Sequence, residues 1–201
     1  RALAARISDA MDFMAACGIT PETTPALSQT EFYTSHEALL LGYEQAMTRE
    51  DSTRPGEYYD TGAHMVWIGD RTRQLDGAHV EFCSGIRNPV GMKCGPSLAP
   101  DDMMRLIDKL NPDNIPGRLT LIARFGSDKV EAGLPKLVRA VQKEGRTVVW
   151  SSDPMHGNIE KTDGGYKTRP FDRILSEVKN FMDIVEAEGA HPGGIHLEMT
   201  G

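Results

Sequence analysis

The stretch LTLIARFG, residues 119–126, is a short apolar run that ends on a cation and a glycine. An apolar run without polar alternation is typical of a parallel strand that is covered on both faces. Four further runs share this arrangement, each ending on charged or metal-capable side chains: HMVWIGDRTR (64–73), PVGMKCGP (89–96), TVVWSSDPMHGN (147–158) and GIHLEMTG (194–201). Since enough chain for a helix separates successive runs, the sequence predicts repeated βα units.

Amphipathic segments support this interpretation. Apolar residues recur at helical spacing after the later runs, which predicts helices from residue 100, over 130–145 and over 171–189. Elsewhere the pattern predicts helices over 2–16 and 35–49, loops over 19–31, 50–62 and 154–169, and a polar connection over 72–88.

This order of elements predicts a (β/α)8 TIM barrel, of which the chain would carry about five βα units. A doubly wound sheet has the same order along the chain, but the GxGxxG turn of a dinucleotide-binding fold is absent. We predict one domain, in which residues 1–62 form N-terminal helices and loops and residues 63–201 form the partial barrel. Because the chain starts at Arg1 and stops directly after a predicted strand, we expect it to be part of a longer protein.

Composition narrows the classes of partner. The net charge of −7 over 201 residues argues against a general nucleic-acid partner. No apolar run approaches the ~20 residues of a membrane span, and the N-terminal segment lacks a hydrophobic signal core. Three scattered cysteines without a CxxC pair fit a reducing compartment. We therefore expect a cytoplasmic protein with neither a nucleic-acid nor a membrane partner.

Charged side chains gather at the ends of the five runs. In a β/α barrel these carboxyl ends carry the chemistry, and here they supply Asp70, Arg71, Arg73, Lys93, Arg124, Asp153, His156 and Glu198. An unpaired buried cation is costly, so the cations predict a pocket for a phosphorylated or polycarboxylate substrate. Pairing of each cation with an Asp or Glu stays an open alternative. The stretch KTRPFDR (167–173) is either a phosphate anchor at a helix start or a solvated loop.

His156 and Glu198 are potential ligands for a divalent transition metal. A catalytic metal usually takes three or more protein ligands, so further ligands are needed. His196, on the same face as Glu198, and His191 are candidates. Cys94 is either a nucleophile without an identified base or, as we prefer, a small buried hydrophobe.

Long motifs carry a family resemblance: EFYTSHEALLLGYEQAM, WIGDRTRQLDGAHVEF, NPVGMKCGP, NPDNIPGRLTLIARFG, DPMHGN, GYKTRPFDRI and HPGGIHLEMTG. Together they resemble the class II (plant-like) 3-deoxy-D-arabino-heptulosonate 7-phosphate synthases over nearly the whole chain. The resemblance implies a (β/α)8 barrel transferase with a divalent metal, Mn²⁺ or Co²⁺. It implies condensation of phosphoenolpyruvate with erythrose 4-phosphate, with release of phosphate, as the first step of the shikimate pathway.

The resemblance also assigns roles. It implies that phosphoenolpyruvate binds to Asp70, Arg71, Lys93 and Arg124, where the family more often has Glu in place of Asp70. It implies that His156 and Glu198 are two of four metal ligands and that the catalytic residues are Lys93, Arg124 and His156. The family's Cys ligand, its Asp ligand and an N-terminal Arg have no counterpart here, so we expect a central portion with about strands three to seven of the eight.

Two alternatives stay open. The same residues permit another metal-dependent barrel enzyme, such as an aldolase on phosphorylated sugars. Because ligands are missing, the chain alone is also expected to be a non-catalytic binding or assembly fragment. The resemblance further implies a homo-oligomer and an aromatic effector. The predicted helices at 1–17 and 35–49 offer surfaces for these contacts, and core packing explains their apolar stripes equally well.

Overall fold

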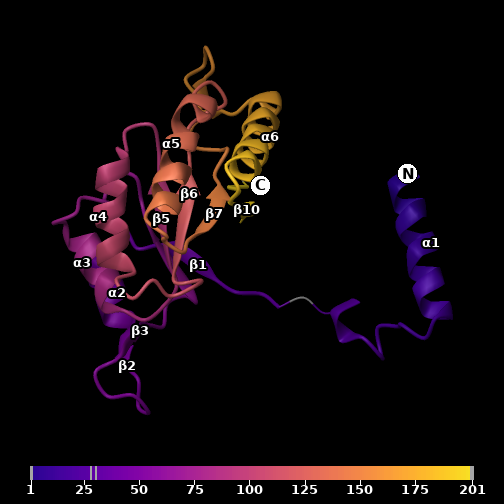
Figure 1. The fold of residues 1–201 in the computed structure, drawn as a ribbon, viewed down its shortest axis with the longest axis horizontal. Coiled ribbons are helices and arrows are strands. Elements are labelled where there is room, and N and C mark those ends of the chain that lie inside the picture. Colours follow the sequence, from indigo (N-terminus) through magenta and orange to yellow (C-terminus); the bar gives the residue numbers. More distant parts are fainter. Residues whose placement is uncertain (1, 28, 30, 200–201) are drawn as a thin grey trace. The chain divides into compact units, whose positions relative to one another are not determined.

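The computed structural model describes residues 2–27, 29 and 31–199. Contacts divide the chain into two compact units, Arg1–Tyr33 and Thr34–Gly201, while the predicted division at residue 62 stays a prediction. The first unit holds helix α1 (Ala2–Ala16), as predicted, and the short 3₁₀ helix η1 (Pro25–Leu27) (Figure 1). On α1 the apolar side chains of Ile7 and Phe13 are exposed.

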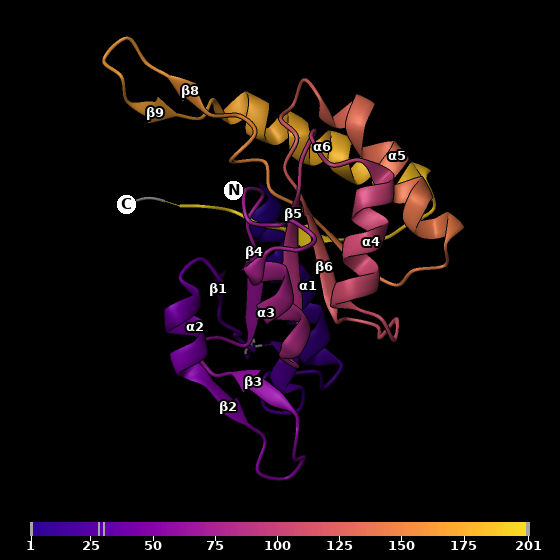
Figure 2. The same ribbon diagram turned by 90° about the vertical axis from the view of Figure 1, so that its left-hand side faces the viewer.

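The second unit is built on a six-stranded parallel sheet, shown with its helices in Figure 1 and from another side in Figure 2. The strands, in sheet order, are β1 (Ser35–Glu37), β4 (Met65–Ile68), β5 (Val90–Cys94), β6 (Leu119–Ala123), β7 (Val149–Ser152) and β10 (Pro192–Ile195). Sheet order and chain order are therefore the same. A doubly wound sheet reverses its direction at a switch point, so this order contradicts that alternative and confirms the predicted partial barrel.

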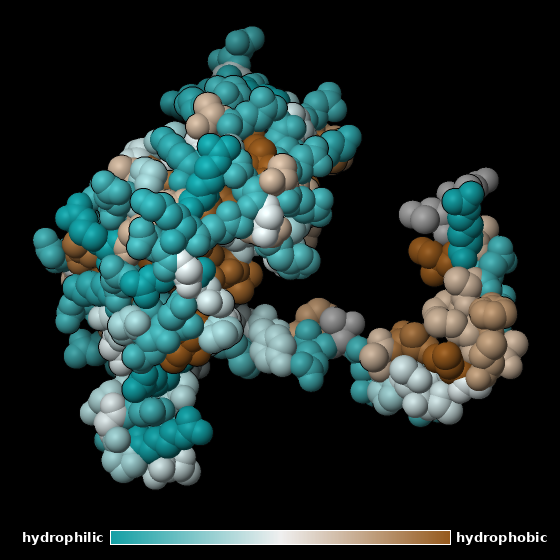
Figure 3. Space-filling view, in the orientation of Figure 1, coloured by the Kyte–Doolittle hydropathy of each residue, from teal (hydrophilic) through white to brown (hydrophobic). Residues whose placement is uncertain are grey.

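Four helices connect the strands: α3 (Ala78–Gly85), α4 (Pro100–Leu110), α5 (Val130–Lys143) and α6 (Phe171–Ala187). Each packs against the next in chain order (Figure 1). Their inner faces bury apolar side chains such as Ile107, Leu134 and Phe181 against the sheet. The face of this unit that Figure 3 shows is mainly hydrophilic. Among the described residues, no helix combines the length and apolar character of a membrane span.

The predicted helix over 35–49 was wrong in its first part. Residues 35–37 form β1, and α2 (Leu41–Met47) starts only afterwards. The reason is a tertiary ladder: β1 pairs in parallel with β4, and Ala38 N–H donates to the Trp67 carbonyl at 2.9 Å. Helical spacing is a weak preference that such pairing overrides.

Three loop predictions also need correction. The polar connection over 72–88 contains α3. The predicted loop over 50–62 contains β3 (Tyr58–Asp60), which pairs antiparallel with β2 (Thr48–Glu50). The loop over 154–169 carries the hairpin of β8 (Glu160–Lys161) and β9 (Lys167–Thr168), which projects from the unit (Figure 2).

The last strand is shorter than predicted. The run over 194–201 supplies only the end of β10, so Glu198 lies beyond the strand, and residues 200 and 201 lie outside the described part. The partner strand β7 ends at Ser152, whose carbonyl accepts from His196 N–H at 2.6 Å. Pro154 then follows without a backbone donor, and the ladder stops.

Glu177 of α6 anchors this helix to the loop that follows β6. Its carboxylate accepts from the backbone N–H groups of Phe125 and Gly126, both at 2.9 Å, and from the Asn158 amide at 2.6 Å. Burial raises the pKa of Glu177, while these three donors oppose the rise. The carboxylate thus satisfies backbone groups that the sheet leaves unpaired.

We expect Glu177→Ala to lower the free energy of unfolding by about 3 kcal/mol, because two buried N–H groups lose their acceptor. Urea denaturation measures this loss. The matched control is Glu186→Ala, an exposed position on the same helix, which leaves the midpoint nearly unchanged. Equal midpoints for the two variants would contradict the anchoring role.

Candidate active site

A cavity of about 560 Å³ lies at the carboxyl ends of the parallel strands. Its lining comes from the ends of β1, β4, β5, β6 and β10, from the loop after β7 and from β9. The lining residues are Glu37, Trp67, Gly69, Asp70, Arg71, Lys93, Arg124, His156, Ile159, Lys167, His196, Leu197 and Glu198. All six side chains that the resemblance assigns to phosphoenolpyruvate or metal therefore line one cavity.

Lys93 is the buried cation of this cavity. It is 5% exposed, and its Nζ lies 2.5 Å from Asp153 Oδ2 and 5.7 Å from the centre of the Trp67 ring. Burial lowers the pKa of Lys93, and the charge of Asp153 opposes this effect. An ammonium has three N–H donors, so pairing with Asp153 leaves two N–H groups that can donate to a ligand.

Asp153 also orients His156. Its Oδ2 lies 2.7 Å from His156 Nδ1, and its Oδ1 accepts from the backbone N–H groups of Met155 and His156. Burial alone would raise the pKa of Asp153, but hydrogen bonds and charge from His156 and Lys93 lower it well below its usual range. Because an ionised carboxylate only accepts, Nδ1 carries a proton and Nε2 is the nitrogen that faces the cavity.

His156 and Glu198 come together as predicted. His156 Nε2 lies 3.6 Å from Glu198 Oε2, too far for a hydrogen bond but a separation that two ligands of one cation can have. Glu198 also pairs with Arg169, whose Nε donates to the Met155 carbonyl. A histidine that donates its other ring nitrogen to a carboxylate is the usual arrangement of a metal ligand, so this pair fits a divalent cation.

Arg124 is held by groups from two other strand ends. Its guanidinium donates to Asp70 at 2.9 Å and to the His156 carbonyl at 3.1 Å. Its Nε is buried and has no hydrogen-bond partner among the described residues. A buried N–H of this kind needs an acceptor, so Arg124 retains a donor for an anionic ligand. Lys93 and Arg124 thus each form an ion pair with an aspartate, which was the open alternative, and both residues also line the cavity.

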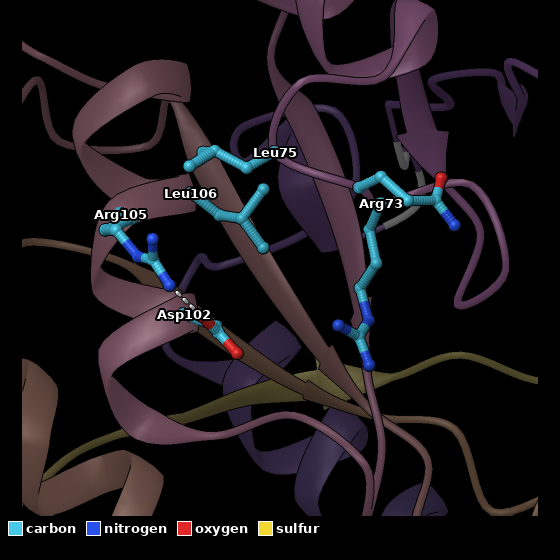
Figure 4. Close-up of a pocket in the computed structure, with 6 residues that line it drawn as sticks. Arg73, Leu75, Asp102, Arg105 and Leu106 are labelled. Carbon is cyan, nitrogen blue, oxygen red and sulfur yellow. Dashed lines mark hydrogen bonds and ion pairs between the residues drawn. The ribbon is translucent and has the colours of Figure 1, made fainter.

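Arg73, one of the strand-end cations predicted to form the substrate pocket, does not line this cavity. Its Nε pairs with Asp70 at 3.2 Å, and its terminal nitrogen donates to Ser97 at 2.9 Å. Instead it borders a smaller pocket of about 230 Å³ opposite the Asp102–Arg105 ion pair of α4 (Figure 4). Asp70 draws it there, because this carboxylate accepts from both Arg73 and Arg124.

Two cations of the lining have no carboxylate partner. Within the part of the chain that the structure describes, neither the guanidinium of Arg71 nor the ammonium of Lys167 forms an ion pair, and both residues are exposed. Lys167 belongs to the stretch 167–173, so one end of that stretch faces the cavity. These free charges leave the mouth of the cavity able to bind an anion.

Of the remaining candidate residues His196, His191 and Cys94, one lines the cavity. His196 lines the cavity, its ring edge-on to Trp67 at 4.8 Å, and burial followed by the charge of Lys93 lowers its pKa. His191 is exposed and lies outside the cavity lining. Burial raises the pKa of Cys94 to about 12, so Cys94 is the expected buried hydrophobe and holds no thiolate.

A close contact of two glycines lets the His156 loop approach the end of β6. A Cβ on Gly157 would lie 2.2 Å from the Gly126 nitrogen, and Gly126 itself has φ +92°. Any side chain at Gly157 would therefore push the two loops apart. His156 precedes Gly157 and Arg124 lies two residues before Gly126, so this contact holds the backbone segments of both cavity residues close together.

Sequence reasoning missed two groups. Glu37 enters the cavity from β1. The sequence did not mark it as a strand-end residue, because the pattern predicted a helix over 35–49. The bridging role of Asp153 had a signal in the sequence: an Asp before Pro154 commonly accepts backbone N–H groups two and three residues on. That it also reaches Lys93 depends on tertiary structure.

The fold and the cavity define a β/α-barrel protein with a cationic site at the carboxyl ends of its strands. A model of the Class-II DAHP synthetase family matches residues 1–201, and the chain belongs to this family. It is 54% identical over 200 residues to a "Phospho-2-dehydro-3-deoxyheptonate aldolase" of Streptomyces coelicolor, covering 99% of this chain and 43% of the relative. It is 54% identical over 191 residues to a "Probable phospho-2-dehydro-3-deoxyheptonate aldolase, chloroplastic" of Catharanthus roseus, covering 95% and 38%. The chain thus spans less than half the length of these curated relatives.

The Lys93–Asp153 pair generates a stability prediction. Asp153→Asn leaves a buried ammonium without its counter-charge, so we expect the free energy of unfolding to fall by about 3–5 kcal/mol at neutral pH. Because folding lowers the pKa of Asp153, its contribution to stability is present above the unfolded pKa of about 3.9 and is lost as pH falls below that value. Urea denaturation as a function of pH should therefore show the difference shrinking in acid.

Two controls accompany this measurement. Adding Lys93→Met to Asp153→Asn removes the unpaired charge, so the double variant should recover part of the loss. Asp183→Asn, an exposed position on α6, should behave as the wild type. A double variant no more stable than Asp153→Asn would contradict the pairing account.

Proposed function

We propose that this chain provides active-site residues of an enzyme that condenses phosphoenolpyruvate with erythrose 4-phosphate. The products would be 3-deoxy-D-arabino-heptulosonate 7-phosphate and phosphate, at the first step of the shikimate pathway. The observation that carries the proposal is the convergence of Asp70, Arg71, Lys93, Arg124, His156 and Glu198 on one cavity. Membership of the family and the names of the two relatives support it.

In this proposal Lys93, Arg124 and Arg71 bind phosphoenolpyruvate. The free Nε–H of Arg124 and the two remaining donors of Lys93 offer hydrogen bonds to its phosphate and carboxylate oxygens. Arg71 adds an exposed positive charge at the mouth. Asp70 would position Arg124 rather than contact the anion, since both of its oxygens already accept from arginines.

A divalent metal is compatible with the family, and we propose that His156 and Glu198 hold it, with Mn²⁺ or Co²⁺ as the ion. Asp153 binds Nδ1 of His156, so Nε2 is the ring nitrogen directed at Glu198. When bound, the metal supplies Lewis-acid polarisation of the aldehyde of erythrose 4-phosphate. Two protein ligands are fewer than catalytic metals usually take, so we expect further ligands from elsewhere in the complete enzyme.

The residues of the chain then favour carbon–carbon bond formation. C3 of phosphoenolpyruvate attacks the aldehyde carbon, water adds at C2, and phosphate leaves from C2. Lys93 and Arg124 neutralise the charge that the phosphate and carboxylate bring into the cavity, where a low dielectric strengthens each interaction. His156 serves as a metal ligand and not as a general base.

The function is tested with the complete gene product, Mn²⁺, phosphoenolpyruvate and erythrose 4-phosphate. We expect phosphate release together with a product of the mass of the seven-carbon phosphate. An enzyme that is folded and metal-loaded but releases no phosphate would contradict the proposal. A product of a different mass would favour the alternative, another aldolase acting on phosphorylated sugars.

Arg71 allows the substrate site to be tested without loss of folding, because it is exposed and unpaired among the described residues. We expect Arg71→Ala to raise KM for phosphoenolpyruvate about 10–100-fold, the effect of about one charge-assisted hydrogen bond, with an unchanged unfolding midpoint. The control is Arg54→Ala in the β2–β3 loop, outside the cavity. A KM equal to that of the control would remove Arg71 from the site.

Two histidines, one inside the cavity and one outside it, allow a controlled test of the metal site. We expect His156→Asn to weaken the binding of one Mn²⁺ ion by about 100-fold or more and to abolish metal-dependent phosphate release. His191→Asn, outside the cavity, should leave both unchanged. Isothermal titration with Mn²⁺ and phosphate release make the comparison. If both variants bound Mn²⁺ alike, His156 would not be a ligand.

The remaining parts of the proposal concern assembly and location. A homo-oligomer and an aromatic effector stay predictions from the resemblance, and a cytoplasmic location stays a prediction from composition. The exposed apolar side chains of Ile7 and Phe13 on α1 support contact of this helix with another surface.

A further inference from the structure

We propose a second divalent-metal site, formed by His36, Glu44 and Asp60, on the side of β1 that faces away from the active-site cavity. Within the described residues, these three form the one close group of His, Cys, Asp or Glu, with ligand atoms all within 4.8 Å of one another. They come from β1, α2 and β3. Since successive strand residues point to opposite faces, His36 lies behind Glu37, which lines the cavity.

The spacing of the ligand atoms fits a metal. His36 Nε2 lies 2.9 Å from Glu44 Oε1 and 2.8 Å from Oε2. Neighbouring ligands of a cation with bonds of about 2.1 Å lie about 3 Å apart, so small movements would admit the ion. Asp60 Oδ2 completes the group: it is buried and has no hydrogen-bond partner among the described residues. An unpaired carboxylate oxygen at such depth requires a cation or a proton.

Asp60 is held rigidly by its surroundings. Its backbone N–H donates to Asn88 Oδ1 at 2.8 Å, and its carbonyl accepts from the same amide at 2.8 Å. Its Oδ1 accepts from Gly62 N–H at 2.8 Å, which leaves Oδ2 directed at the group. A Cβ on Gly62 would lie 3.0 Å from Asp60 Oδ1 and 3.1 Å from the His36 ring, so glycine keeps this space open.

Charge balance favours a divalent ion. Glu44 and Asp60 are 2% and 1% exposed, and two adjacent buried carboxylates repel each other. The nearby Cys83 adds no charge, because burial raises its pKa to about 12. A divalent cation with a neutral imidazole would balance the two carboxylates without any buried proton.

The ligand chemistry selects the class of metal. One imidazole nitrogen with two carboxylates suits Mn²⁺, Fe²⁺, Co²⁺ or Zn²⁺, whereas Ca²⁺ and Mg²⁺ prefer oxygen ligands alone. The His36 side chain is 32% exposed, which gives the ion a path and leaves room for water ligands. The bound ion would tie α2 and β3 to the strand that carries Glu37. We therefore assign the site a structural role that supports one wall of the cavity.

The experiment removes the proposed active-site metal first. In the complete gene product carrying His156→Ala and Glu198→Ala, Co²⁺ binding is measured by equilibrium dialysis and by its visible absorption. We expect about one equivalent of Co²⁺ to remain, and saturating Co²⁺ to raise Tm. Adding Asp60→Asn should abolish this equivalent and the rise in Tm. The amide side chain of the Asp60→Asn variant would keep the oxygen that accepts from Gly62 N–H, so the loop has its contacts.

Two further variants make every outcome decisive. Asp51→Asn, a half-exposed position in the β2–β3 loop, should retain the equivalent of Co²⁺. His36→Gln should lose it, and this variant decides the matter if Asp60→Asn fails to fold. The proposal is overturned if no Co²⁺ binds in the starting variant, or if His36→Gln binds it as before; then His36, Glu44 and Asp60 hold a proton instead. Because activity is not measured, failure here is separate from failure of the proposed function.

Discussion

The buried ion pair of Lys93 and Asp153 is the constraint on which the cavity depends. Lys93 lies on β5 and Asp153 directly after β7, so the pair joins strand ends on either side of β6. Burying both charges costs desolvation energy that their attraction only partly offsets, so such a pair is a weak source of stability. Its value is geometric: it sets where an ammonium and an imidazole stand relative to each other.

This ion pair also positions the other charged residues of the cavity. Asp153 fixes His156, which faces Glu198 across 3.6 Å, and the His156 carbonyl in turn accepts from Arg124. Arg124 is held from its other side by Asp70, which also draws Arg73 out of the cavity. The buried charges are therefore already in place before a ligand enters. Such prior organisation is what allows charged groups to stabilise a reaction that develops charge.

The sequence predicted the sheet because the apolar runs are long and their spacing is regular. It predicted the residues of the cavity because parallel strands bring their carboxyl ends to one edge. It missed β1, since Ser35–Glu37 has no apolar run and becomes a strand only by pairing with β4. It also misplaced Arg73, because the direction of a long side chain depends on which carboxylate reaches it across the fold.

Two layers of charged groups thus stand on opposite faces of β1, with Glu37 in the cavity and His36 behind it. The face that carries Glu37 lines the cavity, where we propose that the anion and the metal bind. The face that carries His36 packs against α2 and β3, where the buried carboxylates need a cation or protons to balance their charge. The edge strand therefore depends on electrostatics as well as on its three-residue ladder with β4.

The most direct test of the account is a crystal structure of the complete enzyme with Mn²⁺ and phosphoenolpyruvate, measured at the manganese absorption edge. We predict an anomalous peak within bonding distance of His156 Nε2 and Glu198, at about 2.0–2.3 Å. We also predict the phosphate or carboxylate of the ligand against Arg124 Nε and Lys93 Nζ. The absence of a metal from His156 and Glu198, or a ligand bound outside this cavity, would contradict the account.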